Sequence, residues 1–395
     1  MDKLIYMDNA ATTSTAPEVV SAMLPFFTEY YGNPSSVYNF AQKSKMAIED
    51  AREIIADSIG AAKSNEIYFT GGGSESDNWA LKSAAFGLRN KGNHIITTKI
   101  EHHAILNTCA YLEKNGFEIT YLDVDSEGFV SLEDVENAIT EKTILISVMF
   151  ANNEIGTIEP VCEIGEIAHK HGILFHTDAV QAMCHVPINV TEMNIDLLSA
   201  SAHKFHGPKG VGFMYMKNSA KLEPFIHGGA QERARRAGTS NVPGIVGMGQ
   251  AVKLALSTLD KDTHTIINMR NYIVDRILGE IPDVTFDGPC IDANAVSAGS
   301  PAGSLKRLPS NMHFCFKDVS GDSLLIMLDM NGICASSGSA CAAGSIDPSR
   351  VLLAIGRSKG ETKGALRLSI DKDLTKEDAD YAIDALKAAV ARLRR

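Results

Sequence analysis

Between about residues 17 and 250, segments with apolar residues at helical spacing alternate with short, almost continuously apolar runs rich in β-formers. The predicted strands are 67–70, 94–98, 117–122, 143–150, 173–177, 195–200 and 211–216, and the predicted helices are 17–31, 40–59 and segments that begin near 74, 102, 132 and 160. This alternation is typical of an α/β domain whose mainly parallel sheet is covered by helices on both faces. Because such sheets bind ligands at the carboxyl ends of their strands, the residues that follow each run are the first candidates for a site.

The pattern changes after about residue 258. A smaller α/β unit is predicted by a helix over 264–278, strands over 284–286, 312–316 and 365–370, and helices over 321–330, after Pro348 and from Thr375. We therefore expect a large domain over 15–258 and a small domain made of 1–14 and 259–395. Residues 293–306, rich in Ala, Gly and Ser, are expected to form a loop or insertion, and no role is assigned to them.

The composition excludes several classes of protein. A chain of 395 residues with 45% hydrophobic content can bury a large core. No apolar run approaches the roughly 20 residues that cross a bilayer, and the N-terminus does not resemble a signal peptide, so we expect a cytoplasmic protein without a membrane partner. The net charge of −11 argues against direct binding of nucleic acid, because phosphate backbones require a basic face.

The cysteine pattern gives no sign of a disulfide framework or of a metal site. Seven cysteines are widely scattered, and no Cys-x-x-Cys pair occurs. We expect no disulfide framework and no metal site. Most of these thiols are expected to be inert core groups.

Lys204 stands out because it follows the buried run 195–200 in the segment Ser-Ala-His-Lys-Phe-His-Gly-Pro-Lys-Gly. An amine at the end of a core strand is partly desolvated, which lowers its pKa and favours the neutral form that condenses with a carbonyl. Lys204 is therefore a candidate for Schiff-base chemistry. The alternative is a surface lysine in a Gly-Pro turn.

Two further strand ends carry candidate binding groups. The segment from Thr70 to Ser74, Thr-Gly-Gly-Gly-Ser, joins a strand to a helix, and its amides suit an anion such as a phosphate. The alternative is a flexible turn with Ser74 as helix N-cap. Asp178 ends the run 173–177, where a buried carboxylate needs a cationic partner such as the ring nitrogen of pyridoxal phosphate; a helix cap is the alternative.

Single residues add to this set. His102 follows the strand 94–98, where its ring could stack on a flat cofactor or serve only a structural role. Cys341 lies in the small-residue segment 336–345, so it is expected to be mobile and exposed; the alternative is an incidental loop cysteine. Arg367 is a charge inside an apolar strand, and its fork fits a carboxylate.

Taken together, these motifs resemble the cysteine desulfurases of the nitrogen-fixation and iron-sulfur-cluster assembly type, within the class V aminotransferase-like family. The resemblance covers nearly the whole chain: 6–13, 32–35, 70–78, 101–102, 152–156, 178–181, 201–210, 236–239, 336–341 and 367. It implies fold type I of the pyridoxal-phosphate enzymes, with a mainly parallel seven-stranded sheet in the large domain and a smaller C-terminal α/β domain that carries the catalytic cysteine loop.

The resemblance also implies a role for each matching residue. Lys204 carries the pyridoxal 5'-phosphate as a Schiff base and removes the substrate Cα proton, Asp178 pairs with the ring nitrogen, and His102 stacks over the ring. Gln181 and Asn153 lie near the phenolate oxygen and the substrate, and Arg367, with Asn153, holds the substrate carboxylate. The implied phosphate ligands are Gly73, Ser74, Ser201, His203 and, from the partner subunit of a homodimer, Thr239.

The implied reaction converts L-cysteine to L-alanine. Cys341 attacks the substrate sulfur as a thiolate, becomes a persulfide, and passes sulfur to an acceptor protein. Selenocysteine lyase or another class V transaminase or lyase is the alternative enzyme, and a sulfur-relay scaffold is the non-enzymatic one. One departure from the family pattern is Gly73, where alanine or threonine is usual, and it is expected to matter little.

Overall fold

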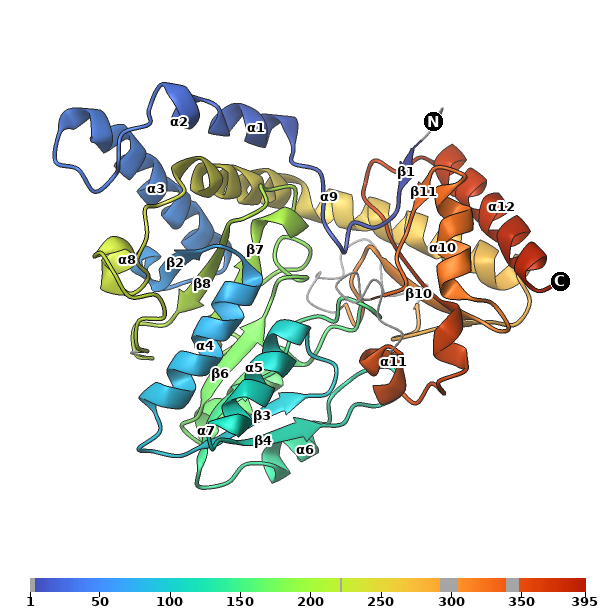
Figure 1. Ribbon diagram of the computed structural model, residues 1–395, viewed down its shortest axis with the longest axis horizontal. Coiled ribbons are helices and arrows are strands. Elements are labelled where there is room, and N and C mark those ends of the chain that lie inside the picture. The colour runs from blue at the N-terminus through green and yellow to red at the C-terminus, as the bar shows by residue number, and fades with distance from the viewer. Residues whose placement is uncertain (1–3, 221, 292–304, 339–347) are drawn as a thin grey trace.

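The large sheet has seven strands, as the sequence predicts, in the order β2-β8-β7-β6-β5-β3-β4 (Figure 1). The computed structural model describes residues 4–220, 222–291, 305–338 and 348–395. The strands are β2 (Ile67–Thr70), β3 (His94–Thr98), β4 (Glu118–Leu122), β5 (Thr143–Ser147), β6 (Leu174–Asp178), β7 (Leu197–Ser201) and β8 (Gly212–Met216). β8 runs antiparallel to both β2 and β7, and the other neighbouring pairs are parallel. The sheet is mainly parallel, with five of its strands buried throughout because helices cover both faces.

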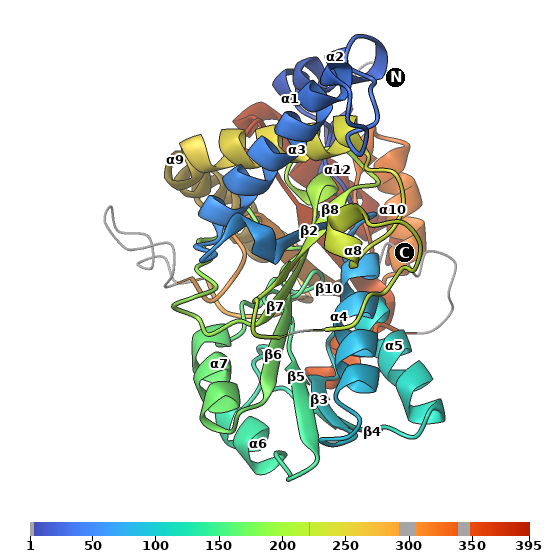
Figure 2. The same ribbon diagram turned by 90° about the vertical axis from the view of Figure 1, so that its left-hand side faces the viewer.

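Helices pack on the two faces of this sheet, and Figure 2 shows α4 (Gly73–Gly87) and α5 (His103–Lys114) on the side opposite α6 (Leu132–Asn137) and α7 (Val161–Lys170). The remaining elements of this part of the chain are α1 (Pro17–Met23), α2 (Pro25–Thr28), α3 (Asn39–Ser58), η1 (Ser64–Glu66), η2 (Ala202–Lys204) and α8 (Gln231–Ala234). The single helix predicted for 17–31 is wrong. It is split because Pro25 has no amide hydrogen to donate to the preceding turn and instead opens α2.

Helix α9 (Val242–Glu280) connects the two cores of the molecule. Its first half buries Met248 and Val252 in the core of the seven-stranded sheet, and its second half buries Ile273 and Ile277 in a separate core. Among the described residues it is the one helix long and apolar enough to cross a membrane, yet these side chains lie inside the protein, so α9 is a core helix.

A second, three-stranded antiparallel sheet, in the order β12-β10-β9, lies under the C-terminal helices. Its elements and their neighbours are β9 (Val284–Phe286), β10 (Asn311–Phe316), α10 (Gly321–Asp329), α11 (Arg350–Ala354), η5 (Glu361–Gly364), β12 (Ala365–Ser369) and α12 (Lys376–Leu393). β1 (Ile5–Tyr6) pairs in parallel with β11 (Ile333–Cys334) beside it. The predicted boundary at residue 258 falls within α9, and the division into domains there stays a prediction. Most of the unassigned stretch 293–306 lies outside the described residues.

Candidate active site

The side chain of Lys204 points at the N-terminal segment 8–16, which we call the strap. Lys204 lies in η2, directly after β7, and its Nζ donates hydrogen bonds to the carbonyl oxygens of Ala10 at 2.6 Å and Ala11 at 2.8 Å. Gln181 Nε2 donates to the same Ala10 oxygen at 3.0 Å. The strap therefore binds both Lys204, which follows β7, and Gln181, which follows β6.

A buried acidic pair lies next to an imidazole at the same edge of the sheet. Ligand atoms of Asp178, His102 and Asp77 all lie within 4.8 Å of one another. Burial raises the pKa of Asp178, while the neighbouring His102 ring, the charge of Lys204 and a hydrogen bond from the Val180 amide at 2.9 Å oppose that rise. The carboxylate of Asp178 is thus tolerated only with a cation beside it.

Asp77, on α4, is a site residue that the sequence reasoning missed. Burial raises its pKa well above the usual range, and the nearby charge of Asp178 raises it further. Asp77 is therefore the neutral member of the pair. The available signal was its position three residues after Ser74, on the first turns of the helix that the glycine segment opens.

His102 forms the N-cap of α5, and its Nδ1 accepts a hydrogen bond from the Ala104 amide at 3.1 Å. That bond fixes the ring orientation, and it requires Nδ1 to be unprotonated. His102 thus serves the helix and borders the acidic pair at the same time, so the structural and functional interpretations of this residue are compatible.

The glycine segment forms a cup at the N-terminus of α4. The cup has a volume of about 560 Å³ and is lined by Thr12, Gly71–Glu75, Ser201, His203, Lys209 and Gly210. Gly72 is the N-cap of α4, so the alternative in which Ser74 caps the helix is wrong. A Cβ on Gly212 would come within 2.8 Å of the Gly72 Cα, which explains the close approach of β8 to the cup.

Gly73 departs from the family pattern for a visible reason. A Cβ at this position would lie 2.5 Å from Val180 Cγ2, closer than unbonded carbon atoms can approach. Val180 is also the residue whose amide binds Asp178. The small residue at 73 therefore lets the cup and the acidic pair pack together in this chain.

The charges around the cup favour an anion. The pKa of His203 is lowered to about 4 by burial and by the charges of Lys204 and Lys209, so its ring is neutral near pH 7. At the rim Glu75 accepts two hydrogen bonds from Arg236, at 2.8 and 3.0 Å, which neutralise its charge. Thr239 is exposed and is not among the described residues that line the cup.

Arg367 is buried in β12 and is bound on two sides. Its Nη1 donates to the Asn153 carbonyl oxygen at 2.8 Å and its Nη2 to Asp8 Oδ1 at 2.8 Å, whereas its Nε has no hydrogen-bond partner among the described residues. Asp8, which the sequence reasoning did not identify, belongs to the strap. Because Asp8 binds Arg367 and Ala10 binds Lys204, the strap holds the two predicted site residues close together.

The segment that leads to Cys341 begins beside Arg367. The backbones of Ser336 and Arg367 exchange hydrogen bonds of 3.2 and 2.6 Å. Cys341 itself lies outside the described residues. Of the other cysteines, Cys109, Cys184 and Cys315 are buried, which raises the pKa of each thiol and makes it inert.

A second cluster of potential metal ligands, Asp287, His313 and Cys315, lies in the small-sheet region. Asp287 Oδ2 contacts His313 Nδ1 at 2.8 Å, and Asp287 Oδ1 accepts from Arg357 Nε at 2.6 Å. The guanidinium thus supplies the positive charge that a metal ion would bring to this carboxylate.

Comparison with known proteins gives a consistent family assignment. The family model described as Aminotransferase class-V matches residues 5–382. A protein named cysteine desulfurase IscS from Clostridium botulinum is 54% identical over 394 residues, which cover 100% of this chain and 96% of that protein.

Solved structures agree with that assignment. One described as a NifS-like protein has a TM-score of 0.90 at 35% identity and covers 99% of this chain and 100% of its own. Another, described as SspA in complex with cysteine, has a TM-score of 0.79 at 38% identity and covers 93% and 99%. The fold type implied by the motifs is confirmed, and the chain belongs to the aminotransferase class-V family.

Proposed function

We propose that this protein is a cysteine desulfurase that uses pyridoxal phosphate to convert L-cysteine to L-alanine and a persulfide on Cys341. The observation that carries the proposal is the meeting of Lys204, the buried Asp178 and the glycine cup at one edge of the sheet, with Arg367 held beside them by the strap. The names of the similar proteins support the same reaction.

The residues present fit the cofactor. The backbone amides of the first turn of α4 suit a phosphate, and its ligands would be Gly73, Ser74, Ser201 and His203. Asp178, whose raised pKa reflects an unfavourable burial of charge, suits a protonated ring nitrogen, and Gln181, Asn153 and His102 would lie around the ring. When bound through Lys204, pyridoxal phosphate supplies an electron sink for the substrate Cα.

The protein's own groups perform the remaining tasks. Arg367 binds the substrate carboxylate. The carboxylate either accepts a hydrogen bond from Nε, which has no partner among the described residues, or replaces Asp8 as the acceptor of the Nη2 bond. Lys204 accepts the Cα proton, and Asn153 helps to orient the substrate. The Cys341 thiolate attacks the substrate sulfur as the carbon–sulfur bond breaks, so that L-cysteine and the enzyme thiol give L-alanine and an enzyme persulfide.

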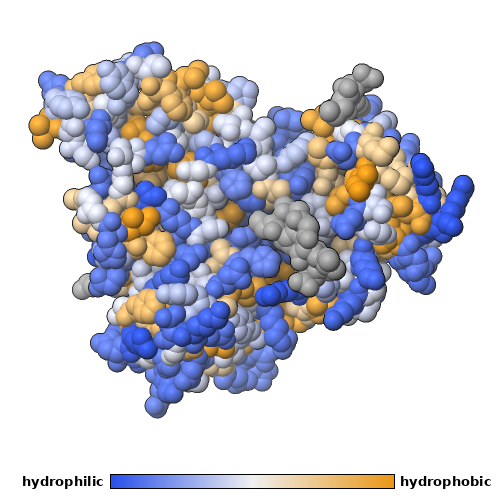
Figure 3. Space-filling view, in the orientation of Figure 1, coloured by the Kyte–Doolittle hydropathy of each residue, from blue (hydrophilic) through white to orange (hydrophobic). Residues whose placement is uncertain are grey.

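We infer that the protein acts as a homodimer in which Thr239 completes the cup of the partner subunit. Thr239 is exposed, and its neighbour Ser240 lines a groove with residues 34–37 and 231–233. Apolar side chains gather close by, over α1 and α2 at the upper left of Figure 3. An exposed apolar surface of this kind is typical of an interface between subunits.

The persulfide would pass its sulfur to an acceptor protein, such as an iron-sulfur scaffold, in the cytoplasm. A selenocysteine lyase could use the same pocket, and comparison of L-cysteine with L-selenocysteine as substrates separates the two. A non-catalytic sulfur-relay scaffold has no use for Lys204 and Asp178, and it is excluded if the purified protein binds the cofactor.

The proposal is tested by replacing Cys341. The Cys341→Ala variant should keep the visible absorbance of the bound cofactor and lose cysteine-dependent sulfide release by on the order of a thousandfold or more, because the nucleophile is gone. Cys162→Ala, which removes an exposed thiol on α7, is the matched control and should keep full activity.

A second variant separates cofactor binding from the thiol chemistry. Lys204→Ala should lose both the covalent cofactor absorbance and sulfide release. Sulfide release retained in Cys341→Ala overturns the role of Cys341. A wild-type protein that never binds pyridoxal phosphate overturns the whole proposal.

A further inference from the structure

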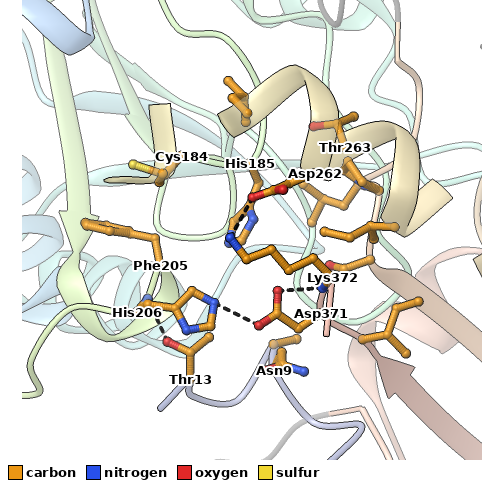
Figure 4. Close-up of a pocket in the computed structure, with 18 of the residues that line it drawn as sticks. Asn9, Thr13, Cys184, His185, Phe205, His206, Asp262, Thr263, Asp371 and Lys372 are labelled. Atoms are coloured by element: carbon orange, nitrogen blue, oxygen red, sulfur yellow. Dashed lines mark hydrogen bonds and ion pairs between the residues drawn. The ribbon is translucent and has the colours of Figure 1, made fainter. Parts of the chain in front are cut away.

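We propose that His206 is a positively charged positioning residue that clamps the loop carrying Lys204 to the strand carrying Arg367, through an ion pair with Asp371. His206 lies two residues after Lys204, and Asp371 lies four residues after Arg367, just beyond the end of β12. Figure 4 shows the two side chains facing each other in direct contact, among the residues that line a pocket. Both residues lie outside the cup and the acidic pair.

The hydrogen bonds of His206 fix its charge. Its Nδ1 lies 3.0 Å from the Ser14 carbonyl oxygen, and its Nε2 lies 3.1 Å from Asp371 Oδ2. A carbonyl oxygen only accepts, so Nδ1 carries a proton, and a carboxylate also only accepts, so Nε2 carries one as well. A ring that donates from both nitrogens is an imidazolium cation.

The backbone of His206 is held in a position that needs external support. Its φ of 61° lies in the left-handed region, which a non-glycine residue adopts at a cost. The His206 amide donates to Thr13 Oγ1 at 2.8 Å, and the Ala16 amide donates to the His206 carbonyl oxygen at 3.0 Å. These contacts with the strap hold the His206 ring in the orientation that contacts Asp371.

His206 therefore joins three segments that carry the reacting groups. The loop contains Lys204, the strap binds the Lys204 amine through Ala10, and Asp371 continues the strand of Arg367. Without the ion pair, the loop and the strap stay attached to each other, but the strand of Arg367 loses its side-chain contact to the loop at this point. The expected result is a substrate carboxylate that is held less well relative to Lys204.

The surrounding charges favour the protonated ring. The hydrogen bond to Asp371 raises the pKa of His206 above its usual range, against the opposing effects of burial and of the Lys372 charge. Burial raises the pKa of Asp371, but the bond and the charge of His206, together with the bond from the Lys372 amide, outweigh burial and lower the pKa overall. Lys372 is itself paired with Asp262 of α9 at 2.8 Å, so the cation and the carboxylate of the clamp face a neutral pair.

The other titratable neighbour is His185, which follows β6. Its Nε2 contacts the Lys204 carbonyl oxygen at 3.0 Å, and burial lowers its pKa, so it stays neutral and adds no competing charge. The side chains of His206 and Asp371 are 29% and 25% exposed, and a cavity of about 80 Å³ borders them. The ring can therefore exchange its proton with water.

The sign of the pH dependence follows from these contacts. The pKa of His206 is raised in the folded protein. The ion pair between His206 and Asp371 is therefore fully formed below that pKa and is lost as the pH rises through it. The catalytic efficiency should consequently fall on the alkaline side as His206 deprotonates.

The kinetic experiment compares His206→Gln, Asp371→Asn and the double variant with the wild type. The matched control is Lys372→Gln, which breaks the neighbouring ion pair with Asp262 and does not alter the loop of Lys204. Near neutral pH each single clamp variant should lower kcat/KM for L-cysteine by about tenfold, mainly through KM, and the double variant should be no worse than either. The alkaline fall should vanish in both Asp371→Asn and His206→Gln, because neither variant retains the ion pair that deprotonation of His206 breaks. Lys372→Gln should keep the wild-type kcat/KM near neutral pH, and its alkaline fall should move to higher pH because the Lys372 charge lowers the pKa of His206.

A measurement without catalysis keeps this inference separate from the proposed function, on which the kinetic part rests. In the purified protein without substrate, NMR titration of the His206 ring should give a pKa above that of a free histidine, and Asp371→Asn should lower it. An unshifted His206, an additive double variant or an equal loss in Lys372→Gln overturns the clamp. His206→Lys, which keeps the positive charge, should recover most of the lost efficiency and move the alkaline fall to higher pH.

Discussion

Two buried carboxyl groups next to each other show how single residues set the chemistry of this site. Asp178 and Asp77 both lose solvation, and each makes ionisation of the other less favourable. The charge of Lys204 and the hydrogen bond from the Val180 amide favour the ionised form of Asp178, whereas burial and the charge of Asp178 favour the neutral form of Asp77. The environment therefore separates one ionised acid from one neutral acid.

This difference predicts unequal effects of the same substitution. Asp178→Asn removes the charge opposite the ring nitrogen and should lower kcat/KM for L-cysteine by on the order of a hundredfold or more. Asp77→Asn replaces a neutral acid by a neutral amide of the same shape, so steady-state kinetics should change little. Equal losses in the two variants would refute the assignment of the charges.

Charged residues at the ends of apolar strands or within them could be identified from the sequence, but their partners could not. Lys204, Asp178 and Arg367 were visible because a charge beside a buried run requires an explanation. Asp8 and the carbonyl group of Ala10 carry no such signal, since their contacts depend on the strap crossing from one sheet to the other. His206 stood in a recognised motif, yet its partner Asp371 is far away in the chain.

At the scale of elements, the packing of α3 against α9 depends on a glycine. A Cβ on Gly249 would lie 2.8 Å from the Ala51 Cβ and 3.0 Å from the Ala51 Cα, so the two helices approach backbone to backbone. Such a contact cannot be relieved by rotating a flexible side chain.

Two glycines of the same helix should therefore respond in opposite ways to alanine. Gly249→Ala should lower the free energy of unfolding by about 1–3 kcal/mol, because it forces α3 and α9 apart. Gly279 is exposed on α9, with no heavy atom of the described chain within 4 Å of its added Cβ, so Gly279→Ala should raise it by about 0.5–1 kcal/mol. Urea denaturation measures both, and a stabilised Gly249→Ala would contradict the close approach.

Glycines in the first turns of α9 explain why the sequence predicted a helix only over its second half. Gly244, Gly247 and Gly249 lower the helix propensity of its first turns, and only their contacts in the folded protein show why they are there. The strands were easier to predict, because a strand buried on both faces must be apolar almost throughout. The exact topology, with β8 reversed between β2 and β7, is a property of the long-range contacts.

At the scale of the whole molecule, the exposed apolar surface near α1, α2 and α3 is too large to be a set of isolated side chains. Val37 is 95% exposed and Phe27 58%, and they are accompanied by Leu24, Tyr31, Tyr38, Phe40 and Met46. On the other side of the molecule Ile326 and Met330 of the α10 region are also exposed. The first set lies nearer to the segment of Thr239, which is why we infer the dimer there.

Charge placed on that surface should weaken the dimer. Phe27→Asp and Val37→Asp should each raise the dimer dissociation constant by about tenfold or more, since a buried apolar side chain contributes roughly 1.5–3 kcal/mol. Met330→Asp is the control and should leave the dimer intact. Light scattering across a dilution series measures the outcome, and dissociation caused by Met330→Asp alone would place the interface elsewhere.

The strap has a consequence for the order in which the protein can form during synthesis. β1 pairs with β11, and the strap residues Asn9 and Ala10 bind Ser369, so these early residues obtain their partners only after nearly all of the chain has left the ribosome. The strands from β2 to β8 have no such requirement and can assemble earlier. An unfinished chain can thus present a sheet and a glycine cup, but its lysine acquires a fixed orientation only when translation is almost complete.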